Sequence, residues 1–370
     1  MNIKRTLEWY FTGAITTRPP ELLPAYKRAV KTMQEFGHVP SAHVAADDPY
    51  HPFGGKEAKG ANVHDVDFAG LRNSVGLVAE LSGATTGGGA EIDYAIRAGM
   101  PVLATWDKKR HASWYIVHWA NSSCPPPNLQ IMPYESEEHL EGVIRKFCTG
   151  VRDALPPRNG LYITVEGGEG SGKSTQSKRL IDYLRSKGYE LIDSREPGGT
   201  DRAEKIREML LSPHIKETLY PLGELFLFEA ARVQIFEEVI KPALAAGKSI
   251  VTDRSFFSTF TYQGFGRELG VQAIDPMNRL ATTGISPDLA FIINVDYRQA
   301  KVAMGEFGDQ LDRIERAGPE FHKRVQEGYL AAAQRHRNVH VIPYIPGGID
   351  EMQAQIRAIT DKFIEENVIK

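Results

Sequence analysis

A glycine-rich loop in the middle of the chain constrains its fold more than any other feature. Residues 167–174 read Gly-Gly-Glu-Gly-Ser-Gly-Lys-Ser and follow an apolar run, Leu161–Val165. The spacing fits G-x-x-x-x-G-K-[S/T] at every fixed position, and glycines in this pattern let backbone N–H groups converge on phosphate oxygens. The loop therefore predicts a strand, a phosphate-binding turn and a helix whose positive end also attracts phosphate.

The central position of the loop leaves a domain's length of chain ahead of it. The chain has 370 residues, of which 42% are hydrophobic and 25% charged, as is usual for soluble globular proteins. The segment 151–159 is polar and contains a Pro-Pro pair, which is typical of a linker. We therefore expect a first domain at 1–150, a linker at 151–159 and a second domain at 160–370.

Strand-like and helix-like segments alternate in both halves. In the first half the periodicity predicts strands at 9–15, 43–46, 75–81 and 101–105, a loop at 83–89, and helices at 21–36, 67–73, 90–98 and 136–148. In the second half it predicts strands at 161–165, 249–252 and 289–295, with helices between them. Such alternation favours an α/β protein with two doubly wound parallel-sheet domains.

Charge and hydropathy narrow the range of partners. The formal net charge is −3, so no strong field is directed at nucleic acid or an anionic membrane. The first residues lead into no apolar stretch long enough for a signal peptide or a membrane span. We expect a cytoplasmic protein with neither a nucleic-acid nor a membrane partner.

Further motifs follow the loop. They comprise Arg-Glu-Pro-Gly-Gly-Thr at 195–200, Asp253-Arg254, Tyr-Gln-Gly at 262–264 and Leu-Asp-Arg-Ile-Glu at 311–315. Phe228 and Arg232 lie one helical turn apart, so that a ring and a guanidinium share a face. Asp253 ends an apolar strand, where P-loop folds place a carboxylate near Mg²⁺ and substrate.

Together these motifs resemble thymidylate kinase over residues 160–366. The resemblance implies a P-loop kinase domain that phosphorylates dTMP with ATP and Mg²⁺. The implied ATP-binding residues are Gly167, Gly170, Ser171, Gly172, Lys173, Ser174 and Thr175, and the implied Mg²⁺ ligands are Ser174 and Asp253. The implied dTMP-binding residues are Glu169, Arg195, Phe228, Arg232, Arg254, Ser258, Thr259, Tyr262 and Gln263.

The resemblance also assigns roles within the acceptor site. It places Glu169 at the deoxyribose 3′-hydroxyl, the Phe228 ring against thymine and Arg232 at the base edge. Arg254 clamps the acceptor phosphate and is catalytic together with Lys173. Considered alone, Phe228 is more typical of a core aromatic, and Arg232 is consistent with a solvated surface arginine.

Two departures from the family pattern leave alternatives open. The family places a transition-state arginine either in the P-loop, where this chain has Gly170, or in a lid, here 301–310, which contains none. The kinase is then slow, uses Lys301 or Arg313 instead, or has become a binding module. Ser255 replaces an aromatic residue after Asp-Arg, which leaves room for a modified pyrimidine.

The first half contains a second candidate anion site. The stretch 82–91 reads Ser-Gly-Ala-Thr-Thr-Gly-Gly-Gly-Ala-Glu between a predicted strand and a predicted helix. Free N–H groups at the helix start, with Thr85 and Thr86, suit an anion. Glu91 lies in the first turn, either as a functional carboxylate or as a helix-dipole partner. Asp65 and Asp67 are alternatively helix caps.

This half resembles the nucleoside 2-deoxyribosyltransferase superfamily, most closely 2′-deoxynucleoside 5′-phosphate N-hydrolases, over residues 8–148. The matching pieces are 10–15, 43–46, 64–67 and 87–91. The resemblance implies a flavodoxin/Rossmann-like domain in which Glu91 is the nucleophile, Asp67 assists protonation and Tyr10 positions Glu91. The implied dNMP-binding residues are Gly13, Arg18, His43, Thr85, Gly87, Gly89 and Ser113, the last supplied by a partner subunit.

The two resemblances combine into a bifunctional enzyme that acts on deoxynucleoside monophosphates. Both families tend to dimerise, so a homodimer is implied. A deoxyribosyltransferase activity in the first half is the alternative chemistry. A half that only binds nucleotide is the alternative of another class.

Overall fold

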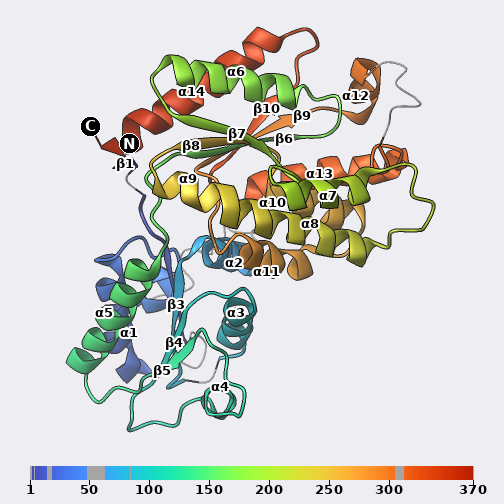
Figure 1. Cartoon of the computed structure of the whole chain (residues 1–370). Helices are drawn as coiled ribbons and strands as arrows, with labels where there is room; N and C mark the ends of the chain where they lie inside the picture. The colour runs from blue at the N-terminus through green and yellow to red at the C-terminus, as the bar shows by residue number, and fades with distance from the viewer. Residues whose placement is uncertain are drawn as a thin grey trace. The chain divides into compact units, whose positions relative to one another are not determined.

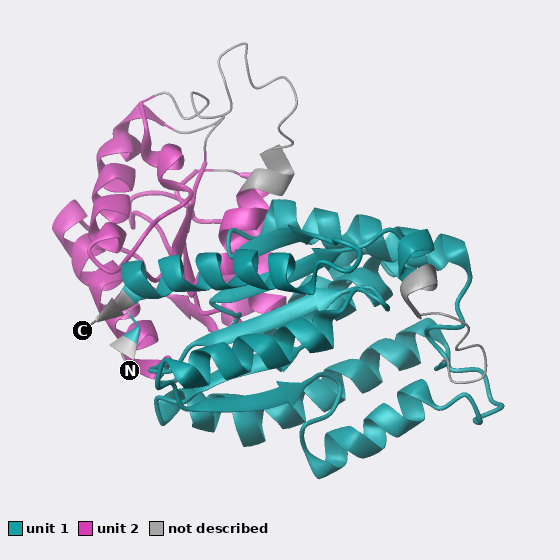
Figure 2. Cartoon of the chain, turned by 90° about the horizontal axis from the view of Figure 1, so that it is seen from above, with its two compact units in different colours: residues 1–5, 156–370 teal, residues 6–155 magenta. Residues whose placement is uncertain are grey.

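The computed structural model describes residues 2–3, 5–14, 19–47, 63–83, 85–304 and 312–369. The chain forms two compact units, residues 6–155 and residues 1–5 together with 156–370 (Figure 2). We call the first the N-terminal unit and the second the P-loop unit.

The unit boundaries differ from the predicted ones at two places. Residues 151–154 are the last turn of helix α5 (Glu137–Ala154) and not part of a linker, because buried Val151 extends the apolar face of that helix. Residues 1–5 group with the P-loop unit, where strand β1 (Asn2–Ile3) pairs antiparallel with β11 (Val368–Ile369). A two-residue strand carries no periodicity from which it can be predicted.

The N-terminal unit contains a four-stranded parallel sheet in the order β2-β3-β4-β5. Its strands are β2 (Trp9–Thr12), β3 (Gly76–Glu80), β4 (Val102–Thr105) and β5 (Leu129–Ile131). Its helices are α1 (Leu23–Gln34), α2 (Val63–Asn73), α3 (Thr86–Arg97), α4 (Trp114–Ala120) and α5, with 3₁₀ turns η1 (Pro20–Leu22) and η2 (Ala42–Ala45).

Helices cover both faces of this sheet. Trp9 and Phe11 of β2 pack in one core with α1 and α5. Tyr10, between them in the sequence, packs in a second core with α2, α3 and α4. Successive side chains of a strand point to opposite faces, so the fully buried strands read as continuous apolar runs.

Three local predictions in this unit are wrong. The run 43–46, predicted as a strand, lies in the 3₁₀ turn η2, since four apolar residues do not distinguish a strand from a turn. The predicted loop 83–89 ends early, because Thr85 caps α3 and its hydroxyl accepts from Gly88 N. Asp65 and Asp67 lie inside α2, which begins at Val63, so neither is its cap.

The P-loop unit contains a five-stranded parallel sheet in the order β10-β9-β6-β8-β7. Its strands are β6 (Tyr162–Gly167), β7 (Leu191–Arg195), β8 (Ser249–Asp253), β9 (Leu289–Asn294) and β10 (Val339–Pro343). The central strand β6 has β8 on one side and β9 on the other. In open parallel sheets, ligands bind in a crevice at the carboxyl ends of the strands, at the point where the strand order reverses.

Helices cover both faces of this sheet as well. Helices α6 (Lys173–Ser186) and α14 (Ile349–Asn367) share one core with β6, and Figure 1 shows both on one side of the sheet. The other helices are α7 (Asp201–Leu211), α8 (Pro221–Ile235), α9 (Lys241–Ala245), α10 (Phe256–Thr259), α11 (Val271–Ala281), α12 (Tyr297–Met304) and α13 (Pro319–Arg335). Two π-helical segments, η4 (Phe236–Ile240) and η5 (Phe260–Gly266), continue α8 and α10.

The two sheets confirm the predicted α/β class with parallel strands and helices on both faces. Within the described residues, no helix has both the length and the apolar character needed to cross a membrane.

Candidate active sites

The glycine-rich loop joins β6 to α6 in the predicted order. Gly167, Gly170 and Gly172 adopt positive φ values of 148°, 70° and 82°. A Cβ at Gly167 would lie 2.7 Å from Ser171 Oγ and 2.8 Å from the Ile293 carbonyl oxygen, so this position requires glycine. Ser171 Oγ is buried and makes no hydrogen bond within the described residues. An incoming phosphate would supply the missing partner.

Ser174 and Asp253 lie together beside this loop. Ser174 Oγ donates to Asp253 Oδ2 at 2.6 Å. A hydroxyl and a carboxylate suit Mg²⁺, which usually keeps several waters and binds one or two carboxylates together with substrate phosphates. Among the described residues, no three His, Cys, Asp or Glu side chains form a group that could hold a metal ion.

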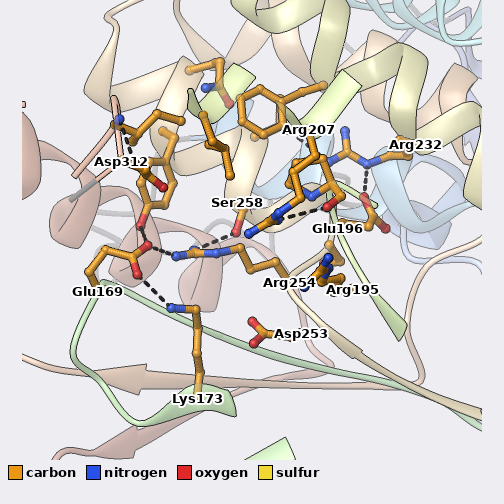
Figure 3. Close-up of a pocket in the computed structure, with 18 of the residues that line it drawn as sticks. Glu169, Lys173, Arg195, Glu196, Arg207, Arg232, Asp253, Arg254, Ser258 and Asp312 are labelled. Atoms are coloured by element: carbon orange, nitrogen blue, oxygen red, sulfur yellow. Dashed lines mark hydrogen bonds and ion pairs between the residues drawn. The ribbon is translucent and has the colours of Figure 1, made fainter. Parts of the chain in front are cut away.

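A cavity of about 260 Å³ opens at the carboxyl ends of β6, β7 and β8. It brings together all nine predicted dTMP residues, from strands and helices far apart in the sequence (Figure 3). These are Glu169, Arg195, Phe228, Arg232, Arg254, Ser258, Thr259, Tyr262 and Gln263. Lys173, Ser174 and Asp253 line the same cavity, so the P-loop and the candidate acceptor site are continuous.

Arg232 is buried, with a relative exposure of 2%, and is held from several sides. Its Nε donates to Glu196 at 2.8 Å, its Nη2 donates to Thr259 Oγ1 at 2.9 Å, and its Nη1 lies 3.0 Å from both Glu229 Oε2 and Asn278 Oδ1. Three of these contacts are hydrogen bonds and use three of the five N–H groups, and Glu229 adds an ion pair. Together they fix the guanidinium plane. Arg232 is therefore not a solvated surface arginine.

Glu169 joins the P-loop to the acceptor side of the cavity. Its carboxylate accepts from Lys173 Nζ at 3.2 Å and from Arg254 Nη2 (Figure 3). Burial alone would raise the pKa of Glu169, but the charges of Lys173 and Arg254 and hydrogen bonds from Lys173 and Glu315 lower it to about 2. Glu169 is thus an anion at neutral pH.

Arg254 has the most demanding backbone of the site residues. Its φ is +72°, in the left-handed region that costs a non-glycine residue about 1–2 kcal/mol. Its backbone N donates to the Val165 carbonyl at 3.0 Å, and its guanidinium carbon lies 5.1 Å from the Tyr262 ring centroid. The strained turn after β8 directs this side chain into the cavity.

The remaining predicted contacts come from α8, α10 and η5. Phe228 is half-buried and lines the cavity while packing against the neighbouring core, so it belongs to both environments. Gln263 Nε2 donates to Glu224 at 2.7 Å. Ser258 donates to Glu166 at 2.7 Å and accepts from Arg254 at 3.2 Å, so its hydroxyl bridges these two side chains.

Several cavity residues were not singled out from the sequence. Glu196 lies inside the Arg-Glu-Pro-Gly-Gly-Thr motif and pairs with Arg232, a signal that the motif offers. Arg207 of α7 lines the cavity and donates to the Pro197 carbonyl at 2.9 Å. The sequence around Arg207 contains no motif that indicates a cavity residue.

Arg313, one proposed replacement for the lid arginine, has other partners. Its Nη2 donates to buried Glu224 at 2.6 Å and its Nε donates to the Leu210 carbonyl at 2.8 Å. Moving Arg313 to a phosphate would leave Glu224 with one arginine fewer in its buried cluster. The Lys301 side chain and residues 305–311 lie outside the described residues.

The N-terminal unit brings its three predicted catalytic residues together. Tyr10 OH donates to Glu91 Oε1 at 2.9 Å. Burial raises the pKa of Glu91, against hydrogen bonds from Thr12 and Tyr10. Burial, and next the charge of Glu91, raise the pKa of Asp67 to about 6. His43 Nε2 lies 3.9 Å from Asp67 Oδ1. Two interacting carboxyl groups with perturbed pKa values therefore share one site.

The first turn of α3 immediately precedes Glu91 on the same helix. Gly87 and Gly89 lie in its exposed first turn, where a Cβ would meet nothing within 4 Å. Gly13 packs against the Tyr26 ring, which a Cβ would approach to 2.7 Å. Ser113 is exposed at the start of α4, and Arg18 lies outside the described residues.

Comparison with known proteins identifies the second half of the chain. The thymidylate kinase family model matches residues 165–356, just over half of the chain. Thymidylate kinase of Chlorobium luteolum is 36% identical over 220 residues, which cover 56% of this chain and 100% of the relative. That of Pelodictyon phaeoclathratiforme is 42% identical over 182 residues, which cover 47% of this chain and 83% of the relative.

A solved thymidylate kinase from Ehrlichia chaffeensis is 32% identical, with a TM-score of 0.45, and covers 55% of this chain and 98% of its own. The P-loop, the acceptor cavity and the family match fall on the same residues. This chain belongs to the thymidylate kinase family.

Proposed function

We propose that the chain is a bifunctional enzyme of deoxynucleotide metabolism. Its P-loop unit phosphorylates dTMP with ATP and Mg²⁺, as membership of the thymidylate kinase family implies. Its N-terminal unit hydrolyses the N-glycosidic bond of a deoxynucleoside monophosphate to free base and deoxyribose 5-phosphate. The observation that carries the first activity is the continuity of the P-loop with the arginine-lined cavity.

In the kinase, the side chains mainly position two phosphates and neutralise charge. In-line phosphoryl transfer requires alignment of the nucleophile and stabilisation of equatorial oxygens more than covalent chemistry. Lys173 is placed for the ATP phosphates, and Arg254 and Arg195 for the acceptor phosphate. Mg²⁺, when held by Ser174 and Asp253, neutralises phosphate charge.

Base and sugar recognition follow from the same cavity. The fixed Arg232 retains two N–H groups beyond its three hydrogen bonds for a pyrimidine edge, and the Phe228 ring borders the same space. Ser255, which replaces an aromatic residue, is buried and donates to Glu166 at 2.8 Å. A pyrimidine with a small 5-substituent other than methyl is therefore a second candidate acceptor.

The kinase test is ADP formation that depends on dTMP. We expect Lys173→Ala to abolish it, since the lysine supplies the charge that orders the ATP phosphates. Lys178→Ala, which removes an exposed lysine from the same helix, is the matched control and keeps the activity. Full turnover in Lys173→Ala would refute the assignment.

The proposed hydrolase rests on the cluster of Tyr10, Asp67 and Glu91. Cleavage of an N-glycosidic bond passes through an oxocarbenium-like state that a carboxylate beneath the sugar stabilises or captures. Glu91 attacks the anomeric carbon, the C–N bond breaks, and Asp67 delivers a proton to the departing base. Water then hydrolyses the glycosyl ester and regenerates Glu91.

A 5′-phosphate subsite at α3 supports hydrolysis of nucleotides over transfer between free nucleosides. The first-turn N–H groups of α3 and Thr85 are suited to an anion, as helix starts are in general. A deoxyribosyltransferase is the competing reading. Adding a free acceptor base to the reaction decides between them, because only a transferase forms a new nucleotide.

The hydrolase test is release of free base from a panel of dNMPs, with and without ATP. We expect Glu91→Ala to abolish release. Asp93→Ala alters a surface carboxylate of the same helix, paired with Arg97, and leaves release unchanged. A fully active Glu91→Ala protein would exclude Glu91 as the nucleophile, and binding of dNMPs without turnover in the wild type would favour a binding module.

We also propose that the chain forms a homodimer through the P-loop unit. Leu222, Phe226 and Val233 are exposed by 50%, 52% and 39% and recur at helical spacing on α8. Exposed apolar side chains on one helix face favour burial against a second copy. Light scattering is expected to give twice the chain mass, and Phe226→Glu to give the monomer.

A further inference from the structure

The buried carboxylate of Glu166 is not used by the mechanism above. Glu166 lies in β6, immediately before the P-loop, and its relative exposure is 0%. A buried carboxylate is costly unless hydrogen bonds satisfy it. Here four hydroxyl groups donate to it: Ser258 at 2.7 Å, Ser255 at 2.8 Å, Tyr329 at 3.2 Å and Thr164 at 3.5 Å.

Two of these hydroxyls also contact Arg254. Its Nη1 donates to Ser258 Oγ at 3.2 Å, to Tyr329 OH at 3.1 Å and to the Gly167 carbonyl at 3.1 Å. A hydroxyl has one proton and two lone pairs. When the protons of Ser258 and Tyr329 point to Glu166, their lone pairs face the guanidinium.

We infer that Glu166 is a positioning residue that aims Arg254 at the acceptor phosphate by orienting the two hydroxyls between them. The inference rests on the proposed role of Arg254 in binding that phosphate. Glu166 also adjoins Gly167, whose carbonyl accepts from Arg254, so the same network ties the start of the P-loop to the acceptor clamp.

Competing arrangements of the network are weaker. Ser258 and Tyr329 lie 3.1 Å apart and can bond to each other, with either as donor. A hydrogen bond to a carboxylate is about twice as strong as one between neutral groups, so both protons favour Glu166. Burial raises the pKa of Glu166, whereas the Ser258 bond, the Arg254 charge and the Ser255 bond lower it.

The chemistry predicts the effect of Glu166→Gln. The amide has one accepting oxygen and one donating nitrogen. Ser258 and Tyr329 donate to the same oxygen of Glu166, Oε2, whereas Ser255 donates to Oε1. Whichever way the amide is turned, the charge that favours both protons is lost. The Ser258 and Tyr329 protons are then free to turn toward each other or toward Arg254, and a proton that faces the guanidinium repels it. A displacement of about 1 Å in a positioning group costs on the order of 10²-fold in rate.

The experiment compares affinity for dTMP with affinity for thymidine, which lacks the phosphate. In Glu166→Gln we expect dTMP to bind at least ~10-fold more weakly, with thymidine affinity and the KM for ATP unchanged. A general loss of structure would weaken both ligands. Thr164→Val, which removes a hydroxyl that donates to Glu166 at 3.5 Å and does not bond to Arg254, is the control and leaves the ratio of dTMP affinity to thymidine affinity unchanged.

Tyr329→Phe is the second variant and decides the matter where Glu166→Gln does not fold. Tyr329→Phe should lower the ratio of dTMP affinity to thymidine affinity. The double variant should lose less dTMP-binding free energy than the sum of the two single variants, because both substitutions act on one network. An unchanged ratio in a cooperatively folded Glu166→Gln or Tyr329→Phe protein overturns the inference. An unchanged ratio in Arg254→Ala would instead overturn the proposed acceptor site.

Discussion

Burial sets the chemistry of individual carboxyl groups in both units. Glu169 is held ionised by Lys173 and Arg254, whereas Asp67 has a pKa of about 6 because it is partly desolvated beside Glu91. Two neighbouring carboxyls with raised pKa values divide the roles of acid and base between them. The N-terminal unit thus contains a pair suited to a nucleophile and a proton donor.

The pH dependence of base release follows from this pair. Asp67 has a raised pKa, so it is protonated and able to donate below about pH 6 and loses the proton above it. We expect kcat/KM for dNMP hydrolysis to fall as pH rises through this range, and to fall again at lower pH as Glu91 protonates. In Asp67→Asn we expect kcat/KM to be lower and no longer to fall as the pH rises. If kcat/KM still falls with rising pH, a group other than Asp67 is responsible.

At the residue scale, the motifs predicted side chains that the fold brings together. The nine acceptor residues proposed from motifs line one cavity. Glu166 and Tyr329, by contrast, were missed because they are 163 positions apart in the sequence and meet only in the folded unit. Burial also decided the two open cases: Arg232 is a buried, fully oriented arginine, and Phe228 serves core and cavity together.

At the scale of elements, the β6–loop–α6 segment was predicted most completely. Its spacing dictates backbone conformations, so the positive φ values and the close approach at Gly167 follow from the glycines themselves. The short apolar run 43–46 and the start of α3 were mispredicted. Four residues carry too little periodicity, and a helix cap overrides a run of small residues.

The loop allows a sharp test of this conformational argument. In Gly167→Ala the new Cβ meets Ser171 and the Ile293 carbonyl below 3.0 Å, so we expect a loss of about 1–3 kcal/mol in stability and a raised KM for ATP. In Gly168→Ala the nearest atom is 3.8 Å away, so stability should change little. Equal effects of the two substitutions in thermal unfolding and kinase assays would contradict the argument.

The π-helical segment η5 was not predicted, although it carries Tyr262 and Gln263 to the cavity. A π turn differs from an α turn by one residue per hydrogen-bonded ring and leaves almost no periodicity signal in seven residues. Such segments occur often at functional sites, as here. The placement of these two side chains was therefore inferred from a motif and explained only by the structure.

At the scale of the whole molecule, a partly buried ion cluster of the P-loop unit joins residues that precede and follow the N-terminal unit in the sequence. Arg5 Nε and Nη2 donate to the Asp288 carboxylate at 2.6 and 2.7 Å, and Arg158 Nη2 lies 3.5 Å from it. The Tyr162 N–H donates to the same carboxylate at 2.8 Å. Residues 1–5 are thus a structural part of the P-loop unit.

Removing this anchor should destabilise that unit selectively. Asp288→Ala leaves two partly buried arginines without their carboxylate, so we expect a loss of about 3–5 kcal/mol. The four tryptophans, at 9, 106, 114 and 119, all lie in the N-terminal unit. In Asp288→Ala, the unfolding temperature followed by tryptophan fluorescence should stay unchanged, whereas kinase activity should be lost at a lower temperature. Glu190→Ala, which breaks the exposed pair with Lys248, is the control, and an equal effect there would refute the anchor.

The sequence by itself determined the α/β class, the phosphate loop, the acceptor motifs and the presence of a separate domain ahead of them. These depend on local spacing and on apolar periodicity, which are properties of consecutive residues. Only the tertiary structure decided that residues 1–5 belong to the P-loop unit, that Arg313 is bound to Glu224, and that Glu166 lies behind Arg254. Each of these depends on which distant side chains share a buried volume, because desolvation and partner geometry act only once the chain has folded.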